Sequence, residues 1–219
     1  MRVIYFVKCT NNMMNKIILD TITGFLICLF VISTALPSRA DICETSPPLG
    51  ADPVYTYQGT YENAAWGYAV DIPKGYKGGL YQDPGAPQQG IMVILSWKPR
   101  STIYFVGEAN SLEEESSGKP LDAIGHSIFG LNLIREYAND IKSYEMHKAK
   151  LGTLQGYKYI VRYTCPGSGD VRIKETIVAV DPQNSPVYTV NLETTQDRYK
   201  KDRLIFNQIV SKWRQIPRK

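Results

Sequence analysis

Short strand-like segments separated by tight turns set the main constraint on how this chain of 219 residues folds. They lie at residues 68–72, 91–97, 102–106, 156–164, 171–180 and 187–192, and Pro, Gly and Asp mark the turns between them. Antiparallel strands can be joined by short turns, whereas parallel strands need crossovers of about a dozen residues or more. We therefore expect residues 91–106 to form a β-hairpin and residues 156–192 to form a three-stranded antiparallel meander.

Two other segments have the period of amphipathic helices. In the first, apolar residues recur every three or four positions, at Leu121, Ile124, Ile128, Leu131, Ile134, Ala138 and Ile141. In the second, Thr194 and Asp197 resemble a capping box. The apolar face that follows holds Tyr199, Phe206, Ile209, Val210 and Trp213. We predict an α+β fold, an antiparallel β-sheet packed with two main helices, in a single domain at residues 54–219 after an extended lead-in at residues 41–53.

Two stretches of the sequence resemble a known family. Residues 63–76 read NAAWGYAVDIPKGY, and the C-terminal part contains VYTVNLETT followed by FNQIVSKW. The first resembles the opening strand and Ile-Pro turn of the PsbP-like and Mog-type α/β/α sandwich proteins, and the second resembles their last strand and C-terminal helix. The resemblance implies an accessory or binding role, because PsbP assists a photosynthetic complex and the Mog type binds a small GTPase. It implies neither partner here, and no family binding residue matches a position in this chain.

Residues 1–40 have the order of features found in a cleavable secretory signal. Lys16 precedes an uncharged run at residues 22–36, and the small residues Ser38 and Ala40 follow it. We predict cleavage after Ala40 and an exported protein, periplasmic or secreted. The alternative is an uncleaved membrane anchor, since residues 17–36 approach the roughly 20 residues that span a bilayer. Met13 or Met14 is an alternative start that would shorten the leader to an ordinary length.

Removal of the leader changes the charge and the cysteine content of the chain. Four of the 25 Lys and Arg residues and one of the 21 Asp and Glu residues leave with it, so the net charge falls from +4 to +1. A nucleic-acid partner is disfavoured, because phosphate contacts need a basic excess. Cys43 and Cys165 remain, and we predict that an oxidising compartment joins them in a disulfide. Two unpaired thiols are the alternative.

No motif in the sequence specifies a catalytic, metal or cofactor site, and we predict none. Residues 125–128 begin like the GxSxG turn of serine hydrolases, but Phe129 stands where the motif needs glycine. On the predicted helix, His126 faces away from the core, on a solvated face. Glu113, Glu114 and Glu115 could donate oxygens to a cation, but consecutive side chains in a loop point in different directions, and we expect a solvated charge run.

Aromatic residues near the start of the domain are the predicted recognition surface. Tyrosine and tryptophan offer a large contact area at low entropic cost. The residues are Tyr55, Tyr57, Tyr61, Trp66, Tyr76 and Tyr81. Packing within strands and turns is the alternative for these side chains. The second helix also has a basic face, which we expect to be solvated, with Arg198, Lys200, Lys201, Arg203, Lys212 and Arg214.

These features favour an exported, non-enzymatic binding or accessory protein that acts through contact with a protein partner of unknown identity. A membrane contact is expected only through the leader, if the leader stays uncleaved. One alternative is an exported hydrolase, for which Ser127 and His126 are the pair that the sequence offers. The other is an inhibitor or immunity protein that acts on another enzyme.

Overall fold

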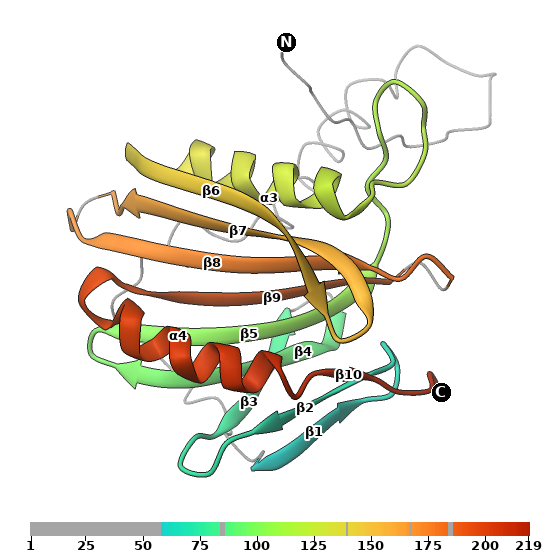
Figure 1. Cartoon of the computed structure of the whole chain (residues 1–219), viewed down its shortest axis with the longest axis horizontal. Coiled ribbons are helices and arrows are strands. Elements are labelled where there is room, and N and C mark those ends of the chain that lie inside the picture. The colour runs from blue at the N-terminus through green and yellow to red at the C-terminus, as the bar shows by residue number, and fades with distance from the viewer. Residues whose placement is uncertain (1–57, 84–85, 139, 167, 184–185) are drawn as a thin grey trace, which may run out of the picture.

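A computed structural model describes residues 58–219, apart from residues 84–85, 139, 167 and 184–185 (Figure 1). The elements follow in the order β1 (Gly59–Asn63), β2 (Tyr68–Ile72), β3 (Gly78–Asp83), β4 (Ala86–Trp97), β5 (Arg100–Ala109), α3 (Ala123–Tyr137), β6 (Asp140–Leu151), β7 (Leu154–Thr164), β8 (Val171–Val180), β9 (Pro186–Thr195), α4 (Gln196–Val210) and β10 (Arg214–Gln215). The described residues form an α+β fold with antiparallel sheets and two helices, as the sequence predicted.

Seven strands form one antiparallel sheet in the order β3-β4-β5-β9-β8-β7-β6. The predicted hairpin is β4 with β5, in which Trp97 pairs with Arg100. The predicted meander is β7, β8 and β9, and β8 occupies the predicted residues. β6 was not predicted. It is an edge strand whose side chains are mostly exposed, so its sequence lacks the apolar alternation that marks a half-buried strand.

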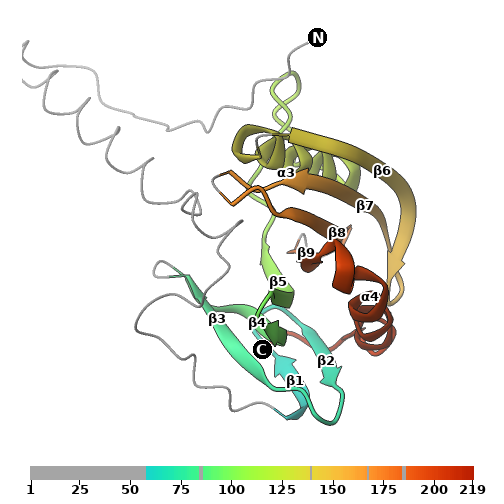
Figure 2. The same cartoon turned by 90° about the vertical axis from the view of Figure 1, so that its left-hand side faces the viewer.

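One face of the large sheet is covered by α4 and by a small sheet in which β2 lies between β1 and β10. Figure 2 shows α4 on the opposite side of the large sheet from α3. The core on the α4 side contains the fully buried side chains of Val70, Ile103, Leu192, Phe206 and Ile209. The predicted apolar face of the C-terminal helix is therefore confirmed.

Three aromatic side chains connect the small sheet, the large sheet and the segment after α4. The ring of Tyr68 stacks on Trp213 with 6.3 Å between centroids, and Tyr188 meets Trp213 edge-on at 5.2 Å. The hydroxyl of Tyr68 donates to the carbonyl of Phe105 at 3.1 Å, and that of Tyr188 donates to the carbonyl of Trp66 at 2.7 Å. Because both hydroxyls have partners, the rings can be buried without leaving a polar group unsatisfied.

The helix α3 packs on the other face of the large sheet, against β7 and β8. Its buried face matches the prediction at Leu131 and Ile134 but differs at the next turn, because Ser127 is fully buried whereas Ile128 is 40% exposed. The buried face is shifted toward Ser127 and Gly130, where small residues let the helix approach the sheet closely. A Cβ added at Gly130 would lie 2.8 Å from the hydroxyl of Tyr159 in β7.

Three further predictions about the helices were wrong. His126 is 8% exposed and not solvated, because the loop before α3 covers it. Ile141 belongs to β6, since α3 ends at Tyr137. Thr194 does not cap α4: it lies in β9, and its hydroxyl donates to Asp202 at 2.7 Å.

Both helices contain 15 residues, fewer than the roughly 20 that a membrane span needs. Within the described residues, no helix has the length and apolarity to cross a membrane. The predicted leader at residues 1–40 lies outside the described residues, and so does the membrane anchor that is its alternative.

Candidate functional site

A cleft of about 750 Å³ lies at the N-terminal end of α3, and we call it the α3 cleft. In Figure 1 this is the right-hand end of the large sheet, where the β6–β7 hairpin also lies. The apolar residues that line it are Pro120, Leu121, Ala123, Leu154, Val180 and Pro182. The other lining residues are Asn110, Asp122, Lys148, Thr153, Gln155, Gly156, Tyr157 and Asp181. Ligand sites commonly have about 300–1,000 Å³ and apolar walls with a few polar groups, so this cleft is the candidate functional site.

The wall of the cleft at the start of α3 is fixed by local hydrogen bonds. Asp122 is the N-cap, and its Oδ1 accepts a hydrogen bond of 2.8 Å from the backbone N–H of Gly125. The loop before it folds back on itself, with the N–H of Leu121 donating to the carbonyl of Leu112 at 2.8 Å. An N-cap carboxylate satisfies an otherwise unpaired N–H and lies at the positive end of the helix dipole. The start of α3 is therefore held in one position beside the cleft.

Behind this wall, the buried His126 is hydrogen-bonded to the half-buried Asn110. Asn110 Nδ2 donates to the carbonyl of Leu121 at 2.9 Å, so its Oδ1 faces His126 Nε2 at 2.7 Å. An amide oxygen can only accept, and Nε2 therefore carries the hydrogen. Burial lowers the pKa of His126, although the nearby Asp122 carboxylate opposes the shift. The imidazole is thus neutral at neutral pH, and it positions Asn110 without adding a charge to the cleft.

The floor of the cleft is the side of the β6–β7 hairpin that faces α3. Lys148 in β6 and Tyr157 in β7 are directly paired across the two strands. Gln155 lies two residues before Tyr157 and therefore on the same face. Within the part of the chain that the structure describes, these three side chains make no hydrogen bond or ion pair. The floor thus presents a lysine, an amide and a phenol with unused hydrogen-bonding capacity.

Other polar side chains of the cleft are already engaged within the protein. The carboxylate of Asp181 accepts from the N–H of Gln183 at 2.9 Å and from Gln215 Nε2 at 3.1 Å. The hydroxyl of Thr153 donates to Gln215 Oε1 at 3.0 Å. These contacts attach the β6–β7 turn and the turn after β8 to the C-terminal segment. They hold the rim of the cleft in place.

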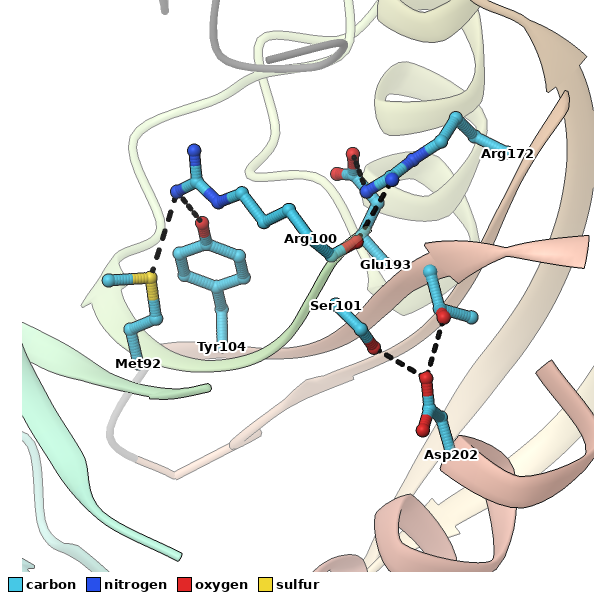
Figure 3. Close-up of polar contacts among 8 residues, drawn as sticks. Met92, Arg100, Ser101, Tyr104, Arg172, Glu193 and Asp202 are labelled. Atoms are coloured by element: carbon cyan, nitrogen blue, oxygen red, sulfur yellow. Dashed lines mark hydrogen bonds and ion pairs between the residues drawn. The ribbon is translucent and has the colours of Figure 1, made fainter. Parts of the chain in front are cut away.

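A second polar cluster lies at the opposite end of the large sheet, where β5 begins (Figure 3). Arg172 Nη1 donates to the carbonyl of Arg100 at 2.9 Å, and its Nη2 lies 3.4 Å from Glu193 Oε1. Arg100 Nη2 donates to the hydroxyl of Tyr104 at 3.2 Å. Arg172, Arg100 and Glu193 are all buried. Their contacts join β5, β8 and β9, which indicates a structural role.

The same end of the sheet is joined to α4 by Asp202, whose side chain is 0% exposed. Figure 3 shows Ser101 pointing toward this carboxylate. Oδ2 accepts hydrogen bonds of 2.7 Å from the hydroxyls of Ser101 and Thr194. Arg198 donates to both carboxylate oxygens at 3.1 Å. Arg198 was predicted to lie on a solvated face, but it instead compensates a buried charge.

Of the first three predicted recognition residues, Tyr55, Tyr57 and Tyr61, the structure describes Tyr61. Tyr55 and Tyr57 lie outside the described residues. Tyr61 is 3% exposed, and its ring packs against that of Tyr68 at 6.0 Å between centroids. Tyr61 is therefore a core residue, and its assignment to a recognition surface was wrong. Buried and exposed side chains alternate at this end of β1, and Tyr61 occupies a position that faces the core.

The remaining predicted recognition residues are distributed over different places. Trp66 is half-buried, and the guanidinium carbon of Arg218 lies 5.6 Å from its ring centroid. Tyr76 is half-buried and lines a smaller pocket of about 250 Å³ together with Trp97. Tyr81 lies in β3, where it pairs with Gly90 of β4. Neither Trp66 nor Tyr76 lines the α3 cleft.

Ser127 and His126 do not form a nucleophile and its base. The hydroxyl of Ser127 is buried and donates to the carbonyl of Ala123 at 2.7 Å. The imidazole of His126 is bonded to Asn110. A nucleophilic serine needs a base within hydrogen-bonding reach and access to the substrate. This geometry does not support a hydrolase built on that pair.

The acidic run lies in the loop before α3. Glu113, Glu114 and Glu115 are all exposed, as expected for a solvated run. Glu114 Oε2 accepts a hydrogen bond of 2.8 Å from the hydroxyl of Ser117. Among the residues that the structure describes, no group of three or more His, Cys, Asp and Glu side chains is arranged to hold a metal ion.

Of the two cysteines in the predicted disulfide, Cys165 follows β7 and is 1% exposed, within the core under α3. Cys43 lies outside the described residues. The pairing of these cysteines stays a prediction.

Sequence reasoning missed the cleft, because its walls come from residues 110–123, 148–157 and 180–182. The available signal was the alternation in residues 154–164, which places Tyr157 and Tyr159 on one face of a strand. Tyr159 is buried under α3, and Tyr157 lies beyond the end of that helix. The sequence does not indicate which residues of β7 the start of α3 covers, so Tyr157 could not be distinguished from a core residue.

No protein-family model and no curated protein matches this sequence. Solved structures with a similar fold include the Ran-binding protein Mog1p of Saccharomyces cerevisiae, at 10% identity and a TM-score of 0.46, covering 74% of this chain and 96% of that one. The cyanobacterial PsbP (CyanoP) of Synechocystis has 14% identity and a TM-score of 0.44, covering 77% of this chain and 99% of that one. LpqN of Mycobacterium tuberculosis, described as involved in cell envelope biogenesis, has 16% identity and a TM-score of 0.45, covering 68% of this chain and 83% of that one. These likenesses concern the fold alone.

Proposed function

We propose that this chain is an exported, non-enzymatic binding protein that holds a segment of a partner protein in the α3 cleft. The observation that carries the proposal is the combination of apolar walls with three polar side chains, Lys148, Gln155 and Tyr157, that have no partner among the described residues. Polar side chains without a protein partner in a partly apolar cleft can form hydrogen bonds with a ligand and so fix its orientation.

The position of the cleft favours a protein segment as the ligand. Lys148 belongs to β6, which is the edge strand of the large sheet. The opposite side of the cleft is formed by the loop before α3 and by the first residues of the helix. A segment of a partner can therefore enter from the sheet edge without displacing any element of the fold.

The test compares two variants that carry the same substitution at exposed positions. Gln155→Trp places a large side chain in the cleft, whereas Gln208→Trp places it on α4, on the other side of the large sheet. The full-length chain is expressed in its own host with a C-terminal affinity tag, and the retained proteins are quantified by mass spectrometry. We expect a partner that wild type and Gln208→Trp retain equally and that Gln155→Trp retains about tenfold less, equivalent to about 1.4 kcal/mol of binding free energy. Equal retention by both variants, or no retained protein, would contradict the proposal.

Export is the second part of the proposal. The leader at residues 1–40 carries the protein out of the cytoplasm and is cut after Ala40, which leaves the lead-in at residues 41–53 and one domain at residues 54–219. The order of Lys16, the uncharged run and the small residues Ser38 and Ala40 supports this. The mass of the protein isolated from its host is expected to correspond to an N-terminus at Asp41. A mass that includes the leader would contradict cleavage.

A further inference from the structure

We infer that the segment bound by the α3 cleft presents a carboxylate next to an apolar side chain, and that Lys148 and Tyr157 bind the carboxylate. This inference rests on the proposed function, because it specifies the chemistry of a ligand for the same cleft.

The unused side chains of the cleft offer more hydrogen-bond donors than acceptors. The carboxylates of Asp122 and Asp181 already accept hydrogen bonds from within the protein. The groups that remain unused include Lys148, whose ammonium can only donate, and Tyr157, whose hydroxyl can donate. A ligand that complements them must therefore bring an acceptor, and an anionic oxygen makes the strongest hydrogen bond with an ammonium group.

The β6–β7 hairpin holds Lys148 beside Tyr157. Lys148 and Tyr157 are directly paired, so their Cβ atoms are about 4.5–5.5 Å apart on the same face of the sheet. Both side chains are long enough to reach one carboxylate between them. Gln155 pairs with Lys150 one step further along the same face, so a second lysine adds positive charge beside the first.

Two negative charges near the cleft bear on this argument. Asp122 lies at the N-terminus of α3, where the helix dipole and the bond from Gly125 offset its charge. Asp181 is 5% exposed and is hydrogen-bonded to Gln183 and Gln215 on the far rim. Lys148 is the cationic side chain of the lining, and Lys150, on the same face of β6, adds a second positive charge near the site.

An apolar wall lies beside the proposed carboxylate site. Val180 in β8, the strand next to β7, lines the cleft. Leu121 closes the wall from the side of α3. An apolar side chain next to the ligand carboxylate would contact these residues and bury apolar area, which adds affinity that a free anion cannot obtain.

Two peptides that differ in one charge test the inference. Both are acetylated and amidated at their ends, and their sequences are GLELG and GLQLG. We expect GLELG to bind the wild-type chain about five- to tenfold more tightly than GLQLG, because a charge-assisted hydrogen bond is stronger than a neutral one. NMR titration of the nitrogen-15-labelled protein should shift the amide signals of Gln155 and Tyr157.

Matched variants locate the effect. Lys148→Met should lower the affinity for GLELG to that for GLQLG, whereas Lys201→Met, at an exposed position of α4, should leave both affinities unchanged. Both lysines are exposed, so the variants are expected to fold. Equal affinities of the two peptides, no binding of either, or an unchanged preference in Lys148→Met would overturn the inference. If sodium acetate or acetyl-leucine competes as strongly as GLELG, the ligand is a small carboxylic acid and the assignment to a protein segment is overturned.

The outcome can be separated from that of the proposed function. If Gln155→Trp abolishes partner capture but the two peptides bind equally, the carboxylate inference fails and the proposed function stands. If Gln155→Trp has no effect on capture, the proposed function fails, whatever the peptides do.

Discussion

Replacing Arg198 with methionine is expected to lower the free energy of unfolding by about 3 to 5 kcal/mol, the usual cost of leaving a buried charge without its partner. The side chain of Asp202 is fully buried, and Arg198 is its ion-pair partner among the described residues. Arg198 supplies two hydrogen bonds of 3.1 Å, including the one that Oδ1 accepts. Methionine keeps much of the apolar stem and removes the charge, so Asp202 would retain only the two hydroxyl donors from Ser101 and Thr194.

A second buried carboxylate provides the matched control. Glu175 lies 3.1 Å from Arg203 and 3.4 Å from Lys158, and it accepts a hydrogen bond of 2.7 Å from the hydroxyl of Tyr199. Arg203→Met leaves Lys158 and Tyr199 in place, and Arg203 is itself 41% exposed. We therefore expect this variant to lose only about 1 kcal/mol, as for a partly exposed ion pair.

The assay is urea unfolding followed by tryptophan fluorescence, with thermal unfolding as a second measurement. Arg198→Met should lower the melting temperature by roughly 6 to 20 °C, since 1 kcal/mol corresponds to about 2–4 °C in a chain of this size. Adding Asp202→Asn to Arg198→Met should restore part of the loss, because it removes the uncompensated charge. Equal losses in Arg198→Met and Arg203→Met, or no recovery in the double variant, would refute the reasoning.

Three further predictions concern stability and the cysteines. Burial lowers the pKa of His126 in the folded chain. As the pH falls through about 6.5, the unfolded chain therefore takes up a proton before the folded chain does. We expect the wild type to lose more unfolding free energy between about pH 7.5 and pH 5.5 than H126Q does. Gly90→Ala should lower the free energy of urea unfolding by about 2 kcal/mol or more, since its Cβ would lie 1.8 Å from the carbonyl oxygen of Phe105; an unchanged value would contradict the close strand contact. We propose that Cys43 and Cys165 form a disulfide, so thiol labelling of the denatured, non-reduced protein should modify neither; two labelled cysteines would exclude it.

Most of the fold could be predicted from local patterns. β2 and β8 occupy the predicted residues, because alternating apolar side chains record which side of a strand faces the core. The C-terminal helix was predicted with its correct buried face. β6 was missed because the side chains of this edge strand are mostly exposed and show no alternation of apolar and polar residues.

The faces of the helices were less predictable than their existence. Period alone placed Ile128 toward the core and His126 toward solvent, and both assignments were wrong. Helical apolar residues recur on more than one side of α3, and the small residues Ser127 and Gly130 decide which side meets the sheet. In α4, the sequence could not show that Arg198 points toward Asp202, because a basic residue at the rim of a helix face can either be solvated or pair with a buried acid.

The sequence by itself determined the short strands, the antiparallel connections between them and the helices α3 and α4, because each of these is encoded in neighbouring residues. The tertiary structure decided the position of the α3 cleft, which joins a loop, the start of a helix and a hairpin that are far apart in the chain. It also decided which polar groups there are already bonded and which remain available. Lys148, Gln155 and Tyr157 look like ordinary strand residues in the sequence, and they line one cleft only because folding brings α3 to an end of the sheet that it does not fully cover.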